Sequence, residues 1–148
     1  MADIIVCAVG GGGILAGLAA AIKLSGHTSC RLYGVEPTGS QTMYQSFQHG
    51  CPVAMPVKTI ASGLAPPFAG QHTFLHCRQF VDDIVLVADE EIISAMWKLY
   101  DGGLKVEPSG AAALAAVLTG KIPDVSGKNV VVVVSGGNVT PEELCGMK

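Results

Sequence analysis

The chain is poor in charge, and its few basic residues do not cluster. Charged residues make up only 14% of its 148 residues, and the formal net charge is −3 at pH 7. A protein that grips nucleic acid through the phosphate backbone needs a concentrated surface of lysine and arginine. The composition therefore argues against nucleic acid as a partner.

The chain also has no long hydrophobic run and no recognisable leader. No apolar stretch approaches the roughly 20 residues of a membrane-spanning helix, and the N-terminus lacks the charged lead and cleavage site of a secretory signal. We expect no membrane partner. Hydrophobic residues nevertheless make up 49% of the composition, which indicates a large core or an apolar surface that expects a partner.

Cysteine pairs with short spacing are missing. The chain has 5 cysteines, an odd number, scattered without a Cys-x-x-Cys motif: Cys7, Cys30, Cys51, Cys77 and Cys145. This pattern argues against a disulfide framework and a zinc knuckle, and predicts reduced thiols in the cytoplasm or an organelle matrix. His72 and His76 stand four residues apart beside Cys77, but without a fourth ligand we favour packed or surface histidines over a metal site.

Glycine, by contrast, is abundant at one informative place. Gly10, Gly11, Gly12 and Gly13 lie between the apolar run 4–9 and an alanine-rich helical stretch that begins at Ile14. Glycines permit a tight turn with positive φ, and the helix that follows directs its unpaired N–H groups and the positive end of its dipole into that turn. The order strand, glycine turn, helix predicts a site for a phosphate group.

Strand and helix patterns alternate along the rest of the chain. We expect a single α/β domain over residues 1–148 with an open, mostly parallel sheet and flanking helices. The predicted strands are 3–9, 31–36, 83–87 and 129–134, and the predicted helices are 14–24, 40–48, 71–80, 89–100 and 108–118, with a further helix start at 140–143. The valine run at 129–134 indicates an interior strand, and the alanines of 14–24 indicate a helix buried almost all round. Residues 50–70 form a loop punctuated by proline and glycine, which we expect to be functional or part of an interface.

A second glycine pair follows the valine strand, at Ser135-Gly136-Gly137. In an open α/β sheet, ligands bind outside the carboxyl ends of the strands. Both glycine turns follow strands, so one ligand would contact both of them. The alternative is an ordinary turn.

Glu36 ends the second strand on the same side of the sheet, and three roles remain open for it. With Gly11, Gly13 and Ala16 ahead of it, Glu36 fits a dinucleotide fingerprint and would hold ribose hydroxyls. It would also serve as an oxygen ligand for a divalent cation. The third role is to cap nearby backbone N–H groups.

Several motifs match, in order, those of one enzyme family. The chain resembles the serine/threonine dehydratase and serine racemase family, which are pyridoxal-phosphate (PLP) enzymes of fold type II. The resemblance covers nearly the whole chain and corresponds to the C-terminal half of such an enzyme, within its large domain. The motifs are Gly10–Ile14, Val35-Glu36-Pro37, Thr59–Leu64, Val81–Ile84, Asp89–Ile92, Val106–Ala112 and Val134–Asn138.

The resemblance implies roles for particular residues. The turn Gly10–Gly13 with Ile14 would cradle the PLP phosphate, the backbone of Gly63 would run near the cofactor, and Ser135, followed by Gly136, would meet the pyridine nitrogen. A neutral hydroxyl there makes the ring a weaker electron sink, which suits elimination of a hydroxyl group better than transamination. Glu36 and the carbonyl of Ser40 match two family ligands of a divalent cation, magnesium or calcium, but the family's remaining metal carboxylate falls at Thr42, a poor cation ligand.

The resemblance also shows what this sequence does not contain. The family's Schiff-base lysine motif, its small domain and its substrate-carboxylate loop have no match here, so we assign no catalytic residue in this chain. An abrupt start within an apolar strand agrees with a chain that begins partway through a larger domain. The parent enzyme would convert L-serine or L-threonine to a 2-oxo acid and ammonia, or racemise serine, and this chain alone would be inactive.

Two further functions remain open from the sequence. One is a non-catalytic module that associates with a full-length subunit, or with itself as a homo-oligomer, through its apolar surface. The other is a small dinucleotide-binding domain of the oxidoreductase type, which the second glycine pair disfavours.

Overall fold

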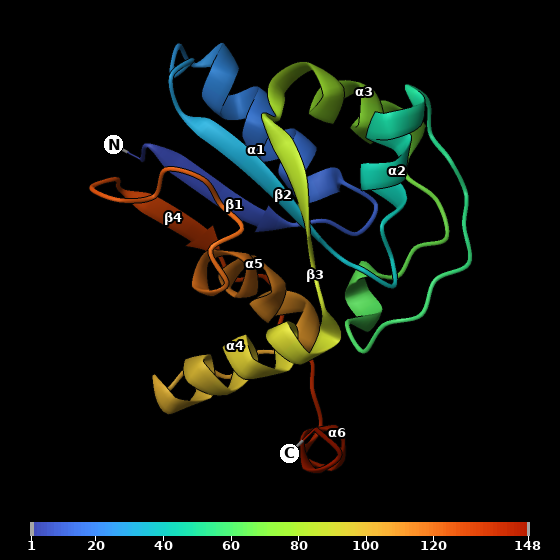
Figure 1. Ribbon diagram of the computed structural model, residues 1–148, viewed down its shortest axis with the longest axis vertical. Helices are drawn as coiled ribbons and strands as arrows, with labels where there is room; N and C mark the ends of the chain where they lie inside the picture. Colours follow the sequence, from blue (N-terminus) through green and yellow to red (C-terminus); the bar gives the residue numbers. More distant parts are fainter. Residues whose placement is uncertain (1, 148) are drawn as a thin grey trace.

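The computed structural model describes residues 2–147. Within them, the chain forms a 4-stranded sheet in the order β3-β2-β1-β4, and every neighbouring pair is parallel. Figure 1 shows the sheet passing through the middle of the molecule. The predicted open parallel α/β fold is therefore confirmed. The strands are β1 (Ile4–Ala8), β2 (Arg31–Pro37), β3 (Asp83–Val87) and β4 (Val130–Val133).

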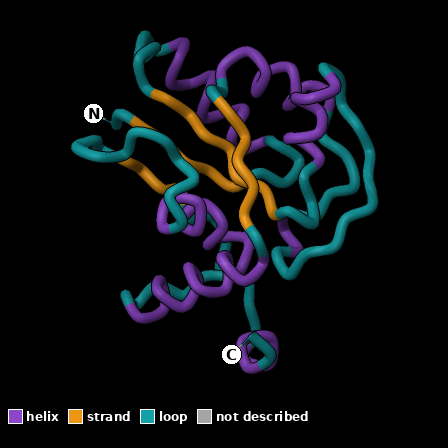
Figure 2. The backbone as a smooth tube through the Cα atoms, in the orientation of Figure 1, coloured by secondary structure: helices purple, strands orange, loops and turns teal. Residues whose placement is uncertain are grey.

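Helices cover both faces of this sheet (Figure 2). One face packs against α1, α2 and α3, and the other packs against α4 and α5. The helices are α1 (Gly13–Leu24), α2 (Thr42–His49), α3 (Gln71–Phe80), α4 (Asp89–Asp101), α5 (Pro108–Leu118) and α6 (Pro141–Cys145), with a single 3₁₀ turn, η1 (Ser62–Leu64). No helix within residues 2–147 combines the length and apolar character that crossing a bilayer requires.

The central strand β1 shows why both faces need helices. Side chains of a strand alternate between the two faces of a sheet, and all five residues of β1 are buried. Ile4, Val6 and Ala8 pack into the cluster formed with α4 and α5, while Ile5 and Cys7 pack into the cluster formed with α1 and α3. Burying each of these larger aliphatic side chains stabilises the fold by roughly 1.5–3 kcal/mol.

The sheet order brings the two glycine turns to one end of the molecule. β1 pairs in parallel with β4, and Cys7 lies opposite Val133 in the register. The chain therefore leaves both strands at the same end of the sheet, where their carboxyl ends lie. The first glycine turn (Gly10–Gly13) follows β1, and the second glycine turn (Ser135–Gly137) follows β4.

Two expectations about burial are wrong. β4 is an edge strand and only partly covered: the side chain of Val131 is 45% exposed. An apolar run reports that a strand could be buried on both faces, but it carries no information about strand order. Helix α1 is also not buried all round, because Ile14 and Leu24 are 53% and 76% exposed. Its contact with the sheet runs instead through Leu15, Ala16 and Ala19.

Candidate functional site

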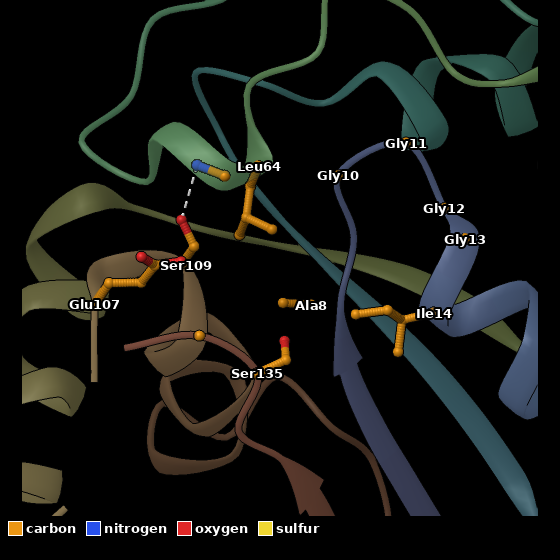
Figure 3. A pocket seen from close by; sticks show the side chains of 12 residues that line it. Ala8, Gly10, Gly11, Gly12, Gly13, Ile14, Leu64, Glu107, Ser109 and Ser135 are labelled. Atoms are coloured by element: carbon orange, nitrogen blue, oxygen red, sulfur yellow. Dashed lines mark hydrogen bonds between the residues drawn. The ribbon is translucent and has the colours of Figure 1, made fainter. Parts of the chain in front are cut away.

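A cavity of about 430 Å³ opens at the carboxyl ends of β1 and β4 (Figure 3). This volume lies in the range of small-molecule and cofactor sites. Every residue that the sequence predicted to bind the cofactor lines it: Gly10, Gly11, Gly12, Gly13, Ile14, Gly63, Ser135 and Gly136. Ala8, Leu64, Glu107 and Ser109 complete the lining. The two glycine turns and the segment around Gly63 thus face one cavity.

Within the first glycine turn, two glycines have an internal reason to be glycine. A Cβ on Gly10 would lie 2.7 Å from the carbonyl oxygen of Gly63. Gly12 has φ 88°, a left-handed conformation, and its Cβ would lie 2.7 Å from Cε of Met43. Glycine is therefore required at these two positions for the turn to pack this close to its neighbours.

Gly11 and Gly13 have no internal steric reason to be glycine. A Cβ on either residue would meet nothing within 4 Å, and neither has positive φ. Both line the cavity. Their packing within the chain does not require glycine. A close approach of the backbone to a ligand in the cavity would require it.

The N-terminal end of α1 supplies the hydrogen-bond donors for that ligand. The first four N–H groups of a helix have no partner within the helix. The amide of Ala16 donates to the carbonyl of Gly12 at 2.9 Å and so closes the first turn of α1. The N-cap Gly12 has no side chain with which to cap the earlier N–H groups. The free N–H groups at Gly13 and Ile14, with the helix dipole, make this turn an anion site.

The second glycine turn forms the opposite wall, together with the start of α5. The amide of Glu107 donates to the carbonyl of Gly136 at 3.2 Å. A Cβ on Gly136 would lie 2.5 Å from Oε1 of Glu107, so this carboxylate lies directly against the turn. Within residues 2–147, Glu107 has no salt-bridge partner. Figure 3 shows Glu107 and Ser109 across the cavity from Gly10–Gly13.

Three side chains hold the third wall, the segment 59–64: two come from α4 and α5, and one comes from the loop between β2 and α2. The amide of Gly63 donates to Oγ of Ser109 at 3.0 Å, and the hydroxyl of Ser40 donates to the carbonyl of Leu64 at 2.7 Å. Asp89 accepts from the hydroxyl of Thr59 at 2.5 Å and from the amide of Ile60 at 3.1 Å. The inner end of the predicted loop 50–70 therefore contributes directly to the site.

Glu36 and Ser40 do not form a cation site in this structure. The carboxylate of Glu36 is 1% exposed and accepts the amides of Met43 and Tyr44, each at 2.8 Å, at the start of α2. Burial raises the pKa of Glu36 to about 7, and these N–H donors only partly offset that cost. Within residues 2–147, no three His, Cys, Asp or Glu side chains are grouped to bind a metal. The structure therefore gives no support to the predicted cation site, and the start of α2 supplies the partners of Glu36.

The same burial bears on the other role considered for Glu36. A carboxylate that is closed off from solvent and bonded to α2 does not reach the hydroxyls of a ribose. Of the three roles open from the sequence, the geometry matches backbone capping.

The histidines and cysteines lie apart from the cavity. Nδ1 of His76 lies 2.8 Å from the carbonyl of His72 on the exposed side of α3. Cys7 and Cys77 are buried, and burial raises their pKa values to about 11 and about 12. All 5 cysteines are free.

Sequence reasoning missed two polar residues of the site, Glu107 and Ser109. Both belong to the Glu-Pro-Ser-Gly motif at the start of α5, for which the sequence left two roles equally open: a helix start that faces the same cleft, or simple capping by Ser109. Ser109 is 4% exposed and bonds across to Gly63. None of the lysines within residues 2–147 lines the cavity.

Comparison with known protein families gives one match over most of the chain. Residues 1–136 match the family model described as "Pyridoxal-phosphate dependent enzyme".

Individual relatives agree with that match. The phenylserine dehydratase of Ralstonia pickettii is 39% identical over 138 residues, which cover 92% of this chain and 42% of that protein. The serine racemase of Schizosaccharomyces pombe is 38% identical over 143 residues, covering 95% of this chain and 43% of that protein. This chain thus spans less than half the length of these curated relatives.

A solved structure shows the same fold. The processed form of threonine deaminase isoform 2 from Solanum lycopersicum superposes with a TM-score of 0.92 at 33% identity. The match covers 99% of this chain and 43% of that one.

Proposed function

The chain belongs to the pyridoxal-phosphate dependent enzyme family, among the serine and threonine dehydratases and serine racemases, and from that premise we propose that its cavity binds PLP with the phosphate in the first glycine turn. The observation that carries the proposal is the uncapped start of α1 beside Gly11 and Gly13, two glycines without an internal steric reason. The donors there are backbone N–H groups, which suit a phosphate dianion. The residues present therefore fit the phosphate end of the cofactor.

Ser135 is the residue we assign to the other end of the cofactor. It lies at the end of β4, on the wall opposite the first glycine turn. Its hydroxyl would donate to, or accept from, the pyridine nitrogen without fixing a charge there. Gly63 and Gly136 would leave room for the flat ring, because neither carries a side chain into the cavity.

PLP supplies an electron sink for the carbon next to the amino group of a bound amino acid. In the whole protein, we propose that this chemistry removes the β-hydroxyl of a hydroxy-amino acid and yields a 2-oxo acid and ammonia, or racemises serine. The support comes from the relatives, whose names include a phenylserine dehydratase and a serine racemase. The role of this chain is to bind and orient the cofactor.

We further propose that this chain alone does not catalyse the reaction. Covalent attachment of the cofactor as a Schiff base requires a lysine at the site, and that lysine is also the natural base for the α-proton; none of the lysines within residues 2–147 lines the cavity. Incubating the purified chain with threonine and PLP should produce no 2-oxobutyrate.

A charge placed in the first glycine turn tests the binding proposal most directly. Gly13→Asp should fold normally, because Gly13 has open space around it and an acidic residue stabilises the start of a helix. Its carboxylate would lie where the phosphate binds and should weaken affinity by roughly tenfold or more. The probe is pyridoxine 5′-phosphate, which lacks the aldehyde and cannot react with surface lysines, measured by equilibrium dialysis.

Gly17→Asp is the matched control. Gly17 is in the same helix one turn away, is exposed, also has open space, and receives the same charge. Its affinity should equal that of the wild-type chain. Failure of the wild-type chain to bind the probe, or equal losses in both variants, would overturn the proposal, and retention of NADH in place of the probe would favour a dinucleotide site.

A further inference from the structure

We propose that Thr73 is a positioning residue for the phosphate site, because its hydroxyl fixes the peptide between Gly11 and Gly12 in the orientation that binds an anion. The inference rests on the proposed function, since it concerns the same turn. It adds a residue on α3, outside the cavity lining, to the set on which cofactor affinity depends.

The contact joins two elements that are far apart in the sequence. Oγ1 of Thr73 lies 2.6 Å from the carbonyl oxygen of Gly11 and 3.0 Å from that of Gly70. A threonine hydroxyl has a single proton, and the shorter distance assigns it to Gly11. Thr73 also packs behind the turn, because a Cβ on Gly12 would lie 3.0 Å from Oγ1 and 3.1 Å from Cβ of Thr73.

The planarity of the peptide bond turns this contact into a constraint on the site. In a trans peptide, the C=O of Gly11 and the N–H of Gly12 point in opposite directions. Thr73 holds the carbonyl toward α3, so the N–H of Gly12 must point away from α3. Gly11 and Gly12 both line the cavity, and Thr73 does not. The hydrogen bond therefore aims a backbone donor at the anion position.

The peptide between Gly11 and Gly12 needs such a constraint because Gly11 has open space around it. A Cβ on Gly11 would meet nothing within 4 Å, and glycine rotates freely through positive and negative φ. Rotation of the Gly11–Gly12 peptide would present a carbonyl oxygen to the phosphate and repel it. A turn fixed before binding spares the ligand the cost of ordering it.

A simpler role for Thr73 must be distinguished from this one. Thr73 is in the first turn of α3, and its contact with Gly70 is one that a residue at a helix start makes locally. In that case, loss of the hydroxyl would affect the stability of α3 and leave the phosphate site unchanged. Stability and phosphate affinity therefore have to be measured separately.

The test uses two substitutions of similar shape. Thr73→Val removes the hydroxyl and keeps the branched side chain, and Thr73→Ser keeps the hydroxyl and removes the methyl group. Thr73→Val should bind pyridoxine 5′-phosphate about five- to tenfold more weakly, which corresponds to the loss of a typical hydrogen bond. Thr73→Ser should retain affinity within about twofold. Thermal unfolding of Thr73→Ser should match the wild-type chain, and Thr73→Val should show only the small decrease expected for one partly exposed hydrogen bond.

Inorganic phosphate supplies the second readout. Its ability to compete with pyridoxine 5′-phosphate should weaken in Thr73→Val and persist in Thr73→Ser, because the effect is confined to the phosphate end. Equal affinity of Thr73→Val and wild type would overturn the inference while leaving the proposed function intact. Equal losses in both variants, or a loss that follows a lowered melting temperature, would show a packing role and overturn it as well. A wild-type chain that binds neither probe would defeat the proposed function itself and this inference with it.

Discussion

The two glycine turns look alike in sequence and differ in structure. The first is followed at once by α1, a 12-residue helix, and is supported by Thr73, Met43 and Gly63. The second continues without regular secondary structure until α6 begins at Pro141, and its support is Glu107 and the backbone of Lys105, whose carbonyl oxygen would lie 2.9 Å from a Cβ on Gly137. Only the first turn presents the start of a helix to the cavity.

This difference separates two uses of glycine. In the first turn, glycine lets a backbone with free N–H groups approach an anion. In the second turn, glycine makes room for the carboxylate of Glu107 and leaves Ser135 as the polar group at the cavity. The first turn therefore suits the charged end of a ligand, and the second suits its neutral end.

The largest effects should come from adding a methyl group at the positive-φ glycine of each turn. Gly12→Ala combines backbone strain with contacts to Met43 and Thr73, so we expect the free energy of unfolding to fall by about 2–4 kcal/mol. Gly136→Ala, with φ 115°, should lose about 1–3 kcal/mol, because the flexible end of Glu107 can move away. Urea denaturation measures both.

Gly26→Ala provides the backbone reference for this pair. Gly26 has the same φ of 88° as Gly12, but a Cβ there would meet nothing within 4 Å. Its loss of stability should be about 1–2 kcal/mol. If Gly12→Ala costs no more than Gly26→Ala, the packing behind the first turn is not what distinguishes the two turns.

A medium effect is expected from Ser135→Ala, which tests the neutral end of the cavity. Loss of one hydrogen bond to the ring should weaken binding of pyridoxine 5′-phosphate by about three- to tenfold. Binding of inorganic phosphate should stay the same, because the first turn is untouched. Parallel dialysis experiments with the two probes check this, and an equal loss for both would remove the distinction between the ends.

The smallest effect on stability is expected at Glu91, on α4. Glu91 on α4 accepts from Nζ of Lys121 and from the amide of Ala88, each at 2.6 Å. Burial by itself raises the pKa of Glu91, but together these donors bring it below its usual value of 4.5. The folded state therefore binds this proton less tightly than the unfolded state, so the stabilisation is present above about pH 4.5 and is lost as the pH falls further.

Denaturation at pH 7 and below pH 4 would measure that loss. Because both side chains are partly exposed, Glu91→Gln should reduce the acid-induced loss of stability by less than about 1 kcal/mol. Glu90→Gln, an exposed neighbour on the same helix, should leave it unchanged. An equal response from both variants would mean that the ion pair between Glu91 and Lys121 does not contribute to the acid-induced loss of stability.

Local signals predicted the elements of the fold because each depends on neighbouring residues. The strand and helix ranges agree with the structure to within a few residues at each end, as for the helix predicted at 71–80 and observed as α3 (Gln71–Phe80). The position of β4 at the sheet edge was not predictable in this way, since it depends on which strand pairs with β1. The gathering of the glycine turns followed from a general rule about parallel strands rather than from their composition.

The polar residues of the site were harder to predict. The sequence predicts Asp89 as a helix cap and leaves capping as one of two roles open for Ser109, because Ser and Asp favour that position. Each instead bonds to the segment 59–64, through Gly63 and through Thr59 and Ile60. A local motif identifies a free hydrogen-bonding group, but the tertiary structure decides which partner it takes.

The pairing of β1 with β4 has a consequence for the order of events during folding. Asp3 and Asn129, which bond beside this pair, are 126 residues apart in the chain. Contacts of such long range form late, after the cost of closing the intervening loop has been met. The cavity takes one wall from Gly10–Gly13 and another from Ser135 and Gly136, so a ligand that touches both walls can bind only after both segments have been made and folded together. Retention of such a ligand would therefore serve as a reporter of completed folding.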